Sequence, residues 1–293
     1  MPSYQDDVIL TRFEETLSHA ALASSTIVNY LADLRAFLRW GRCELTPDFS
    51  LSQARQDHVR RYREYLAQEL NRATSTVNRH LMALRKFFAF AVEFGVASDD
   101  PTAGVALLQT DGQTGSRILT EEEIDQLLTA AENGTRAGLV RRDQAILRLL
   151  LHAGLRVSEL VNLTMDDLTF DYPGVSLEVS RNYNRTNRRR VPLQDKVCRA
   201  LNNYLQVRPQ TPNTNCFFLN QEGRPISKRT VQRIIADCAK AAGLVGVSAQ
   251  SIRRTFARQL LLETQNLSLV SERLGHQNRN ITEQYLANHK DDH

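Results

Sequence analysis

The chain has 293 residues, of which 42% are hydrophobic and 24% charged, and its formal net charge is +4. This length is sufficient for two domains that each bury a core. The longest apolar runs, such as 145–151, are far shorter than a membrane span, and the chain starts with neither a basic segment nor an apolar signal core. We therefore expect a cytoplasmic protein without a membrane partner. The cysteines lack the spacing of a metal site, so we expect reduced thiols at Cys43, Cys198, Cys216 and Cys238.

Arginine dominates the basic residues. Of the 37 lysines and arginines, five are lysines: Lys86, Lys196, Lys228, Lys240 and Lys290. A guanidinium group matches pairs of phosphate oxygens, which suits a protein that binds the DNA backbone. A GC-rich genome also replaces lysine by arginine, so this composition favours nucleic acid only weakly.

The first hundred residues predict a series of helices. In 26–40, one face carries Ile27, Leu31, Leu34 and Leu38. The segments 59–70 and 75–94 repeat this apolar period, and the inward residues of the second are Val77, Leu81, Leu84 and Phe88. Basic residues follow the same helix, and they form either a solvated face or a face for a DNA groove: Arg79, His80, Arg85 and Lys86.

A change of composition divides the chain. The segment 109–117 contains two glycines and no large apolar residue, which is typical of a linker. Thr120 and Glu123 have the spacing of a capping box directly before the apolar Ile124, so a helix is expected to begin there. We therefore predict one domain over 1–108, a linker over 109–117 and a second domain over 118–293.

The second domain is predicted to mix helices with a few strands. A helix is expected over 142–153, and alternation of apolar residues favours a strand over 175–179. The segment 190–193 is the expected returning strand, which makes the polar stretch between the two strands a hairpin. A third strand is expected over 216–219, and helices are expected to resume at Lys228 and continue toward the end of the chain.

Four segments of this domain carry groups suited to chemistry on a phosphate. Each has a structural explanation when it is taken alone, such as a helix-start pair for Arg156 and Glu159, a helix cap for His276 and core packing for Tyr285. In chain order the segments are AGLRVSEL over 153–160, an arginine-rich hairpin over 181–190 without an acidic residue, QSIRRTFA over 250–257, and LGH over 274–276 followed nine residues later by Tyr285.

Together and in this order, the segments resemble the tyrosine recombinases, most closely their Xer-type and phage-integrase branch. The resemblance covers nearly the whole chain, and AGLRVSEL and the spacing from LGH to the tyrosine are its most specific parts. It implies a mainly α fold with two domains. These are an all-helical SAM-like core-binding domain and a mostly helical catalytic domain with a small antiparallel β-sheet.

The resemblance also implies an activity that uses no metal, ATP or other cofactor. Tyr285 would attack a DNA phosphodiester and form a 3′-phosphotyrosyl link, while Arg156, Arg253 and His276 stabilise charge on the phosphate oxygens. Glu159 would orient Arg156. The partner would be double-stranded DNA in the nucleoid, at a near-palindromic site bound by a dimer and recombined by a tetramer. The predicted DNA contacts are Arg79, His80, Arg85, Lys86, Arg185 and Arg254.

Two catalytic positions depart from the family pattern. The family carries a lysine in the hairpin as general acid, and here Arg181 lies nearest that position, with Arg185 next. Arginine stabilises charge but is a poor proton donor, so Lys228 or a water is an alternative acid. Gln250 replaces the histidine expected three residues before Arg253, and it donates hydrogen bonds without carrying charge.

These departures leave other functions open. The first alternative is a DNA-binding accessory protein with impaired cleavage on the same fold. A relaxing enzyme similar to type IB topoisomerases shares the chemistry, but the Xer-like N-terminal domain disfavours it. A helical adaptor with solvated arginines has no positive support.

Overall fold

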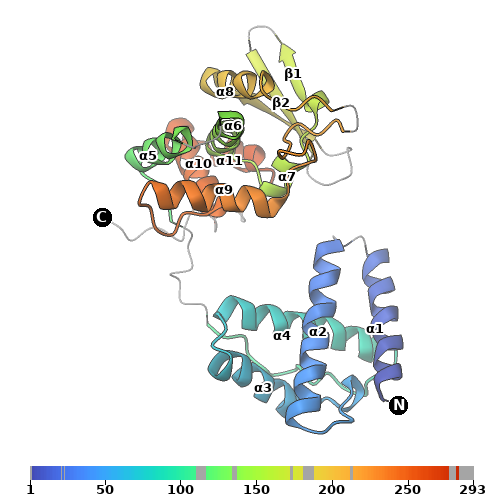
Figure 1. Cartoon of the computed structure of the whole chain (residues 1–293). Coiled ribbons are helices and arrows are strands. Elements are labelled where there is room, and N and C mark those ends of the chain that lie inside the picture. Colours follow the sequence, from blue (N-terminus) through green and yellow to red (C-terminus); the bar gives the residue numbers. More distant parts are fainter. Residues whose placement is uncertain are drawn as a thin grey trace. The chain divides into compact units, whose positions relative to one another are not determined.

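The computed structural model describes residues 2–20, 22, 24–109, 117–133, 137–171, 174–180, 188–211, 214–276 and 282–283. The chain divides into two compact units, Met1–Asp111 and Gly112–His293 (Figure 1). Within the described residues, no helix is both long and apolar enough to cross a membrane. Among its described residues, the regular elements of the first unit are all helical: α1 (Pro2–His19), α2 (Ser24–Glu44), the 3-10 turn η1 (Leu51–Gln53), α3 (Gln56–Glu64), the π-helical turn η2 (Tyr65–Glu69) and α4 (Thr74–Glu93).

The core of the first unit forms where α2 packs against α1, α3 and α4. The predicted apolar faces of α2 and α4 are confirmed, since all eight of their inward residues are buried. Aromatic rings join the helices, and the ring of Phe37 packs edge-on against Tyr62 with centroids 5.0 Å apart. The helix predicted over 59–70 is divided, because α3 passes into the π-helical turn η2 and the chain then turns at Asn71, whose φ is +45°.

The second unit combines helices with one small sheet (Figure 1). Its helix α6 is central, packs against α5, α8 and α10, and buries the whole apolar run 145–151 apart from Arg148. The predicted capping box begins α5, where Thr120 Oγ1 accepts the Glu123 N–H at 3.3 Å and Glu123 Oε2 accepts the Thr120 N–H at 3.1 Å. The helices are α5 (Glu121–Glu132), α6 (Ala137–Ala153), α7 (Val157–Val161), η4 (Met165–Asp167), α8 (Asp195–Leu205), α9 (Lys228–Ala241), α10 (Ala249–Thr264) and α11 (Leu267–Leu274).

The sheet is antiparallel, with the strand order β1 (Leu168–Asp171), β2 (Gly174–Ser180) and β3 (Arg188–Leu193). The predicted pairing of 175–179 with the returning strand is confirmed, and its register places Val175 opposite Leu193 and Val179 opposite Arg189. The prediction of a third strand over 216–219 was wrong, because the third strand is β1. Consecutive residues Phe217, Phe218 and Leu219 are all buried, and this segment makes only isolated bridges among the described residues.

The architecture is therefore mainly α, with a helical first unit and a mostly helical second unit that carries a small antiparallel sheet. This confirms the fold class predicted from the sequence. In the second unit, α7 follows the C-terminal end of α6, α10 contacts both α6 and α11, and β3 contacts α11. These contacts bring together the segments that contain Arg156, Arg253 and His276.

Candidate active site

Arg156 occupies the N-cap position of α7, at the end of a turn that requires glycine. Gly154 has φ +59°, and a Cβ at this position would overlap the ring of Phe256. The carbonyl oxygen of Gly154 accepts a hydrogen bond from Arg253 Nη1. The AGLR segment therefore places one arginine at a helix start and a backbone acceptor in front of a second arginine.

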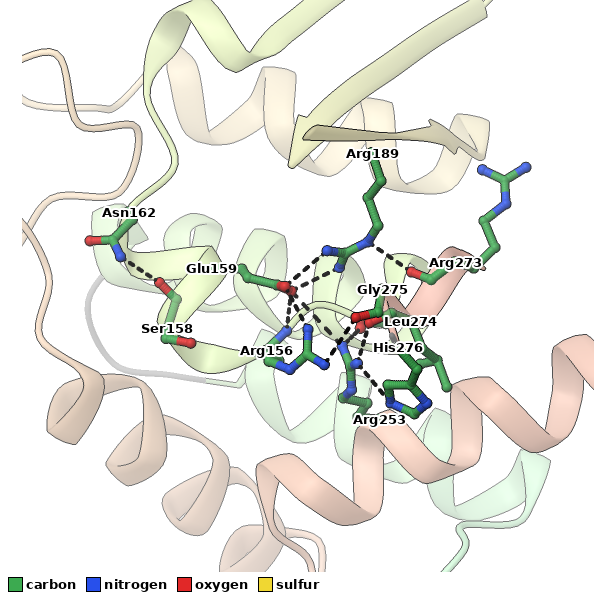
Figure 2. Close-up of polar contacts among 11 residues, drawn as sticks. Arg156, Ser158, Glu159, Asn162, Arg189, Arg253, Arg273, Leu274, Gly275 and His276 are labelled. Carbon is green, nitrogen blue, oxygen red and sulfur yellow. Dashed lines mark hydrogen bonds and ion pairs between the residues drawn. The ribbon is translucent and has the colours of Figure 1, made fainter. Parts of the chain in front are cut away.

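Glu159 lies one turn after Arg156, as predicted, and is only 6% exposed. Its Oε1 accepts Arg156 Nη1 at 2.9 Å, and its Oε2 accepts the backbone N–H of Arg156 at 2.8 Å (Figure 2). Burial opposes ionisation of this carboxyl, but the hydrogen bonds and charge of Arg189, followed by those of Arg156, lower its pKa below the ordinary value. Glu159 is thus a buried carboxylate at the centre of the cluster.

Arg189, on β3, was not singled out from the sequence. Its Nη1 donates to Glu159 Oε1 and its Nη2 to Glu159 Oε2, both at 2.8 Å, and its Nε donates to the carbonyl oxygen of Arg273 at 2.9 Å (Figure 2). Strand alternation was the available signal, because Arg189 shares a face with the buried Val191 and Leu193. An arginine on the buried face of a strand indicates a buried acidic partner.

Arg253 lies on α10 and is 7% exposed. Besides Gly154, its guanidinium donates to the carbonyl oxygen of Leu274 at 2.5 Å, and its Nη1 lies 3.9 Å from Glu159 Oε2. Its Nη2 is 3.5 Å from Nε2 of His276. The backbone contacts hold this guanidinium in one orientation, so its position is set before any ligand binds.

His276 follows Gly275, the residue with φ +65° that ends α11. Its Nδ1 lies 2.8 Å from the hydroxyl of Thr282, a fully buried residue that the sequence reasoning did not identify. This contact fixes the ring plane, since one imidazole nitrogen is engaged by Thr282 while the other is directed toward Arg253. Arg156, Arg253 and His276, which the sequence predicted to act together, therefore lie in one cluster.

The other predicted site residues of the second unit lie on α9 and α10 or outside the described residues. Gln250 is exposed in the first turn of α10, one turn before Arg253. Lys228, the alternative acid, is exposed at the first residue of α9. Arg254 is buried, and its role as a DNA contact stays a prediction. The residues outside the described part are Arg181, Arg185 and Tyr285.

The predicted DNA contacts of the first unit lie on α4. Arg79 is exposed and pairs with the buried Asp33 at 2.5 Å. His80 is 8% exposed, with Nε2 3.4 Å from Asp33 and Nδ1 3.1 Å from the hydroxyl of Tyr62. This burial favours a positioning role for His80, and its contact with DNA stays a prediction. The other two residues are Arg85, which donates to the carbonyl oxygen of Val105 at 2.7 Å, and the exposed Lys86.

The cluster in the second unit is suited to binding a phosphate. Arg156 and Arg253 present guanidinium groups from two helices, and His276 adds an imidazole beside them. Such fixed donors stabilise negative charge that develops on a phosphoryl group. Over the described ranges, no group of three or more histidine, cysteine, aspartate and glutamate side chains could hold a metal ion.

Comparison with known proteins decides the family. Residues 117–292 match the phage integrase family, and residues 10–95 match the N-terminal SAM-like domain of phage integrases. The chain belongs to the phage integrase family. A tyrosine recombinase of Pseudothermotoga lettingae is 29% identical over 95% of this chain and 93% of its own length. The tyrosine recombinase XerC of Pelobacter propionicus is 31% identical over 90% of this chain and 85% of its own.

Solved structures of this family share the fold. XerH bound to a palindromic difH substrate has a TM-score of 0.75 at 19% identity, and the match covers 90% of this chain and 76% of XerH. A lambda integrase dimer bound to a COC′ core site also has a TM-score of 0.75, at 18% identity, over 98% of this chain and 78% of the integrase. The family models and the XerC relative confirm the resemblance to Xer-type tyrosine recombinases that was inferred from the sequence.

Proposed function

We propose that this phage integrase family member is a site-specific DNA recombinase that cleaves and rejoins DNA through a covalent link on Tyr285. One observation carries the proposal. Arg156 and Arg253 come from separate segments of the second unit and meet at the buried Glu159, and His276 lies beside Arg253. A protein that used these arginines only to stabilise its fold would not need to concentrate so many cationic groups beside a single carboxylate.

The proposed reaction is a transesterification. The Tyr285 hydroxyl loses its proton and its oxygen attacks the phosphorus, while the bond from phosphorus to the 5′-oxygen breaks. The products are a 3′-phosphotyrosyl link and, after protonation, a 5′-hydroxyl. Arg156, Arg253 and His276 stabilise the charge that builds on the non-bridging oxygens. A 5′-hydroxyl from another strand reverses the step, so rejoining needs no ATP.

The group that protonates the leaving 5′-oxygen is a separate proposal. We propose that Arg181, in the position of the family lysine, stabilises charge without donating a proton. Loss of the 5′-oxygen should then limit the rate, and a substrate with 5′-bridging sulfur, which leaves without protonation, should react faster than normal DNA. Arg181→Lys should also accelerate cleavage of normal DNA. If sulfur gives no gain and the lysine variant is not faster, another acid such as Lys228 is in place.

The proposed partner is double-stranded DNA at a near-palindromic site. Two relatives support this, since XerH was solved with a palindromic difH substrate and lambda integrase as a dimer on a core site. We propose a dimer on each site and a tetramer during strand exchange. Analytical ultracentrifugation of the protein with one site and with two sites would measure both states.

A nicked suicide substrate tests the activity. Cleavage beside the nick releases a short fragment that diffuses away, so the covalent complex accumulates and survives denaturing electrophoresis. Wild type should form a protease-sensitive adduct, and Tyr285→Phe should form none while its DNA affinity stays within a few-fold, because one hydroxyl contributes little contact area. Adduct in the phenylalanine variant would show that another residue attacks.

A catalytically impaired DNA-binding protein is the second candidate. Two features favour it: Gln250 stands where the family has histidine, and the segment 181–187 contains no lysine. This candidate predicts a shifted DNA complex without covalent product on the same suicide substrate. Sequencing of DNA that co-purifies covalently with the protein would identify the target site of an active enzyme.

A further inference from the structure

We infer that Arg189 is a positioning residue, which neutralises Glu159 so that Arg156 remains available to a phosphate. The inference rests on the proposed function. The three guanidinium groups share Glu159 unequally. Arg189 contacts both carboxylate oxygens at 2.8 Å, Arg156 donates one side-chain hydrogen bond at 2.9 Å, and Arg253 remains 3.9 Å away.

This division follows from the geometry of the pairs. A bidentate arginine–carboxylate contact is the strongest arrangement available to Glu159, and Arg189 supplies it. Because both carboxylate oxygens of Glu159 already accept hydrogen bonds from Arg189, no second bidentate arginine is required. Three guanidinium groups around one carboxylate leave two positive charges uncompensated within this set of four residues. Removal of Arg189 would leave one uncompensated positive charge. The unpaired carboxylate of Glu159 would then attract the guanidinium of Arg156 or Arg253 into the position of Arg189.

Exposure and hydrogen bonding distinguish Arg189 from Arg156. The side chain of Arg156 is 37% exposed, whereas that of Arg189 is 11% exposed. All three guanidinium nitrogens of Arg189 donate within the protein, two to Glu159 and one to the Arg273 carbonyl. Arg189 therefore acts on a phosphate through Arg156 and does not touch it.

The same side chain also supports the segment that carries His276. A Cβ on Gly275 would lie 2.9 Å from Arg189 Nη1, and the φ of +65° at this position already favours glycine. The backbone of α11 thus comes close to Arg189, whose Nε holds the carbonyl oxygen of Arg273. In this way Arg189 links the carboxylate that holds Arg156 to the turn that presents His276.

A double-mutant cycle tests the inference with the full chain. Arg189→Gln should slow covalent adduct formation on nicked DNA by about 10- to 100-fold, the size of effect expected when one pre-organised charge contact is lost. Glu159→Gln in the same protein should recover at least about 10-fold, because the unneutralised carboxylate is then gone. A merely structural role predicts that the second substitution adds to the loss, and that result, or an Arg189→Gln variant as fast as wild type, would overturn the inference.

Controls separate this effect from unfolding. Arg142→Gln breaks another buried arginine–carboxylate contact of the second unit, from Arg142 Nη2 to Asp143 Oδ1 at 2.8 Å, and it should leave the adduct rate unchanged. If Arg189→Gln proves unfolded by circular dichroism, Arg189→Lys takes its place in the cycle. Lysine keeps the charge without the fork, so a loss of several-fold is expected, with the same recovery by Glu159→Gln.

Inorganic phosphate provides a readout that does not depend on cleavage. Its affinity, measured by ³¹P line broadening, should fall several-fold in Arg189→Gln and recover in the double variant with Glu159→Gln. A wild type that forms no adduct but shows this phosphate pattern would refute the proposed function and sustain the role of Arg189. Equal phosphate affinity in all the proteins would overturn the inference, whether or not the adduct forms.

Discussion

His152 provides a test of how burial sets the pH dependence of the second unit. It lies near the end of α6 beside a cavity of about 310 Å³, and its Nε2 is buried without a hydrogen-bond partner in the described part of the chain. Burial, followed by the positive charges of Lys196 and Arg148, lowers its pKa from 6.5 to about 4. The folded protein therefore keeps this ring neutral at pH values where an unfolded chain would protonate it.

The sign and size of the effect follow from this difference in pKa. Above pH 6.5 the ring is neutral in both states, and its contribution to stability is complete. As the pH falls below 6.5 the unfolded chain binds a proton that the folded chain does not, so the free energy of unfolding drops by about 1.4 kcal/mol per pH unit. Between pH 7.5 and 5.0 the loss is about 2 kcal/mol, reduced toward about 1 kcal/mol because the ring is only half-buried and solvent screens its charge.

His152→Phe should remove this component. Urea unfolding of the full chain, followed by far-UV circular dichroism at pH 7.5 and 5.0, should show that the variant loses about 1–2 kcal/mol less than wild type. Fluorescence of Trp40, the only tryptophan, identifies the transition of the first unit in the same samples. Lys196→Gln should give an intermediate result, since it removes one of the charges that oppose protonation. Identical pH dependence in wild type and His152→Phe would refute the assignment.

Three further predictions concern the candidate active site. Arg253→Ala should slow adduct formation on nicked DNA by about 100-fold or more. Arg253→Lys should recover only part of this rate, because the point charge of lysine replaces the planar guanidinium, and full activity of the lysine variant would contradict the role of Arg253. Thr282→Val should slow the same reaction about 10-fold, because His276 loses the hydroxyl that orients its ring, and Thr282→Ser should keep the wild-type rate. An equal loss of rate in both variants would assign the effect to packing. Gly154→Ala should destabilise the second unit by about 2–5 kcal/mol in urea unfolding, because the new Cβ would overlap the ring of Phe256. Gly246→Ala should cost only about 1–2 kcal/mol, since this residue also has a positive φ but a Cβ there would meet no neighbouring atom. Equal costs would show that the ring of Phe256 moves aside.

Helices were predictable where their signals are local. The apolar face of α2 and the capping box of Thr120 depend on residues within a few positions of each other, and both occur as predicted. The strand predicted over 216–219 failed for the opposite reason. Its apolar residues are buried against Tyr204, and the ring centroids of Tyr204 and Phe218 are 5.4 Å apart. A short apolar run without alternation can be buried either as a strand or as a loop, so the pattern alone does not distinguish them.

Among the predicted functional residues, too, only the contacts between neighbours in the sequence were predictable. Arg156 and Glu159 are three residues apart at the start of one helix, so helix geometry alone brings them together. The burial of His80 depends on contacts with Asp33 and Tyr62 from two other helices, which its own helix does not reveal. A basic residue on a polar face therefore does not show by itself whether it meets solvent, DNA or a buried acid.

By itself, the sequence determined the family and the helical character of both units, because motif spacing and helix period are encoded over short distances. Only the tertiary structure decided which arginine neutralises Glu159. Arg189 lies thirty residues after Glu159 along the chain. The two side chains meet because β3 packs against α11 and α7 lies beside them. The contact of Arg189 with both carboxylate oxygens of Glu159 forms only when these elements meet.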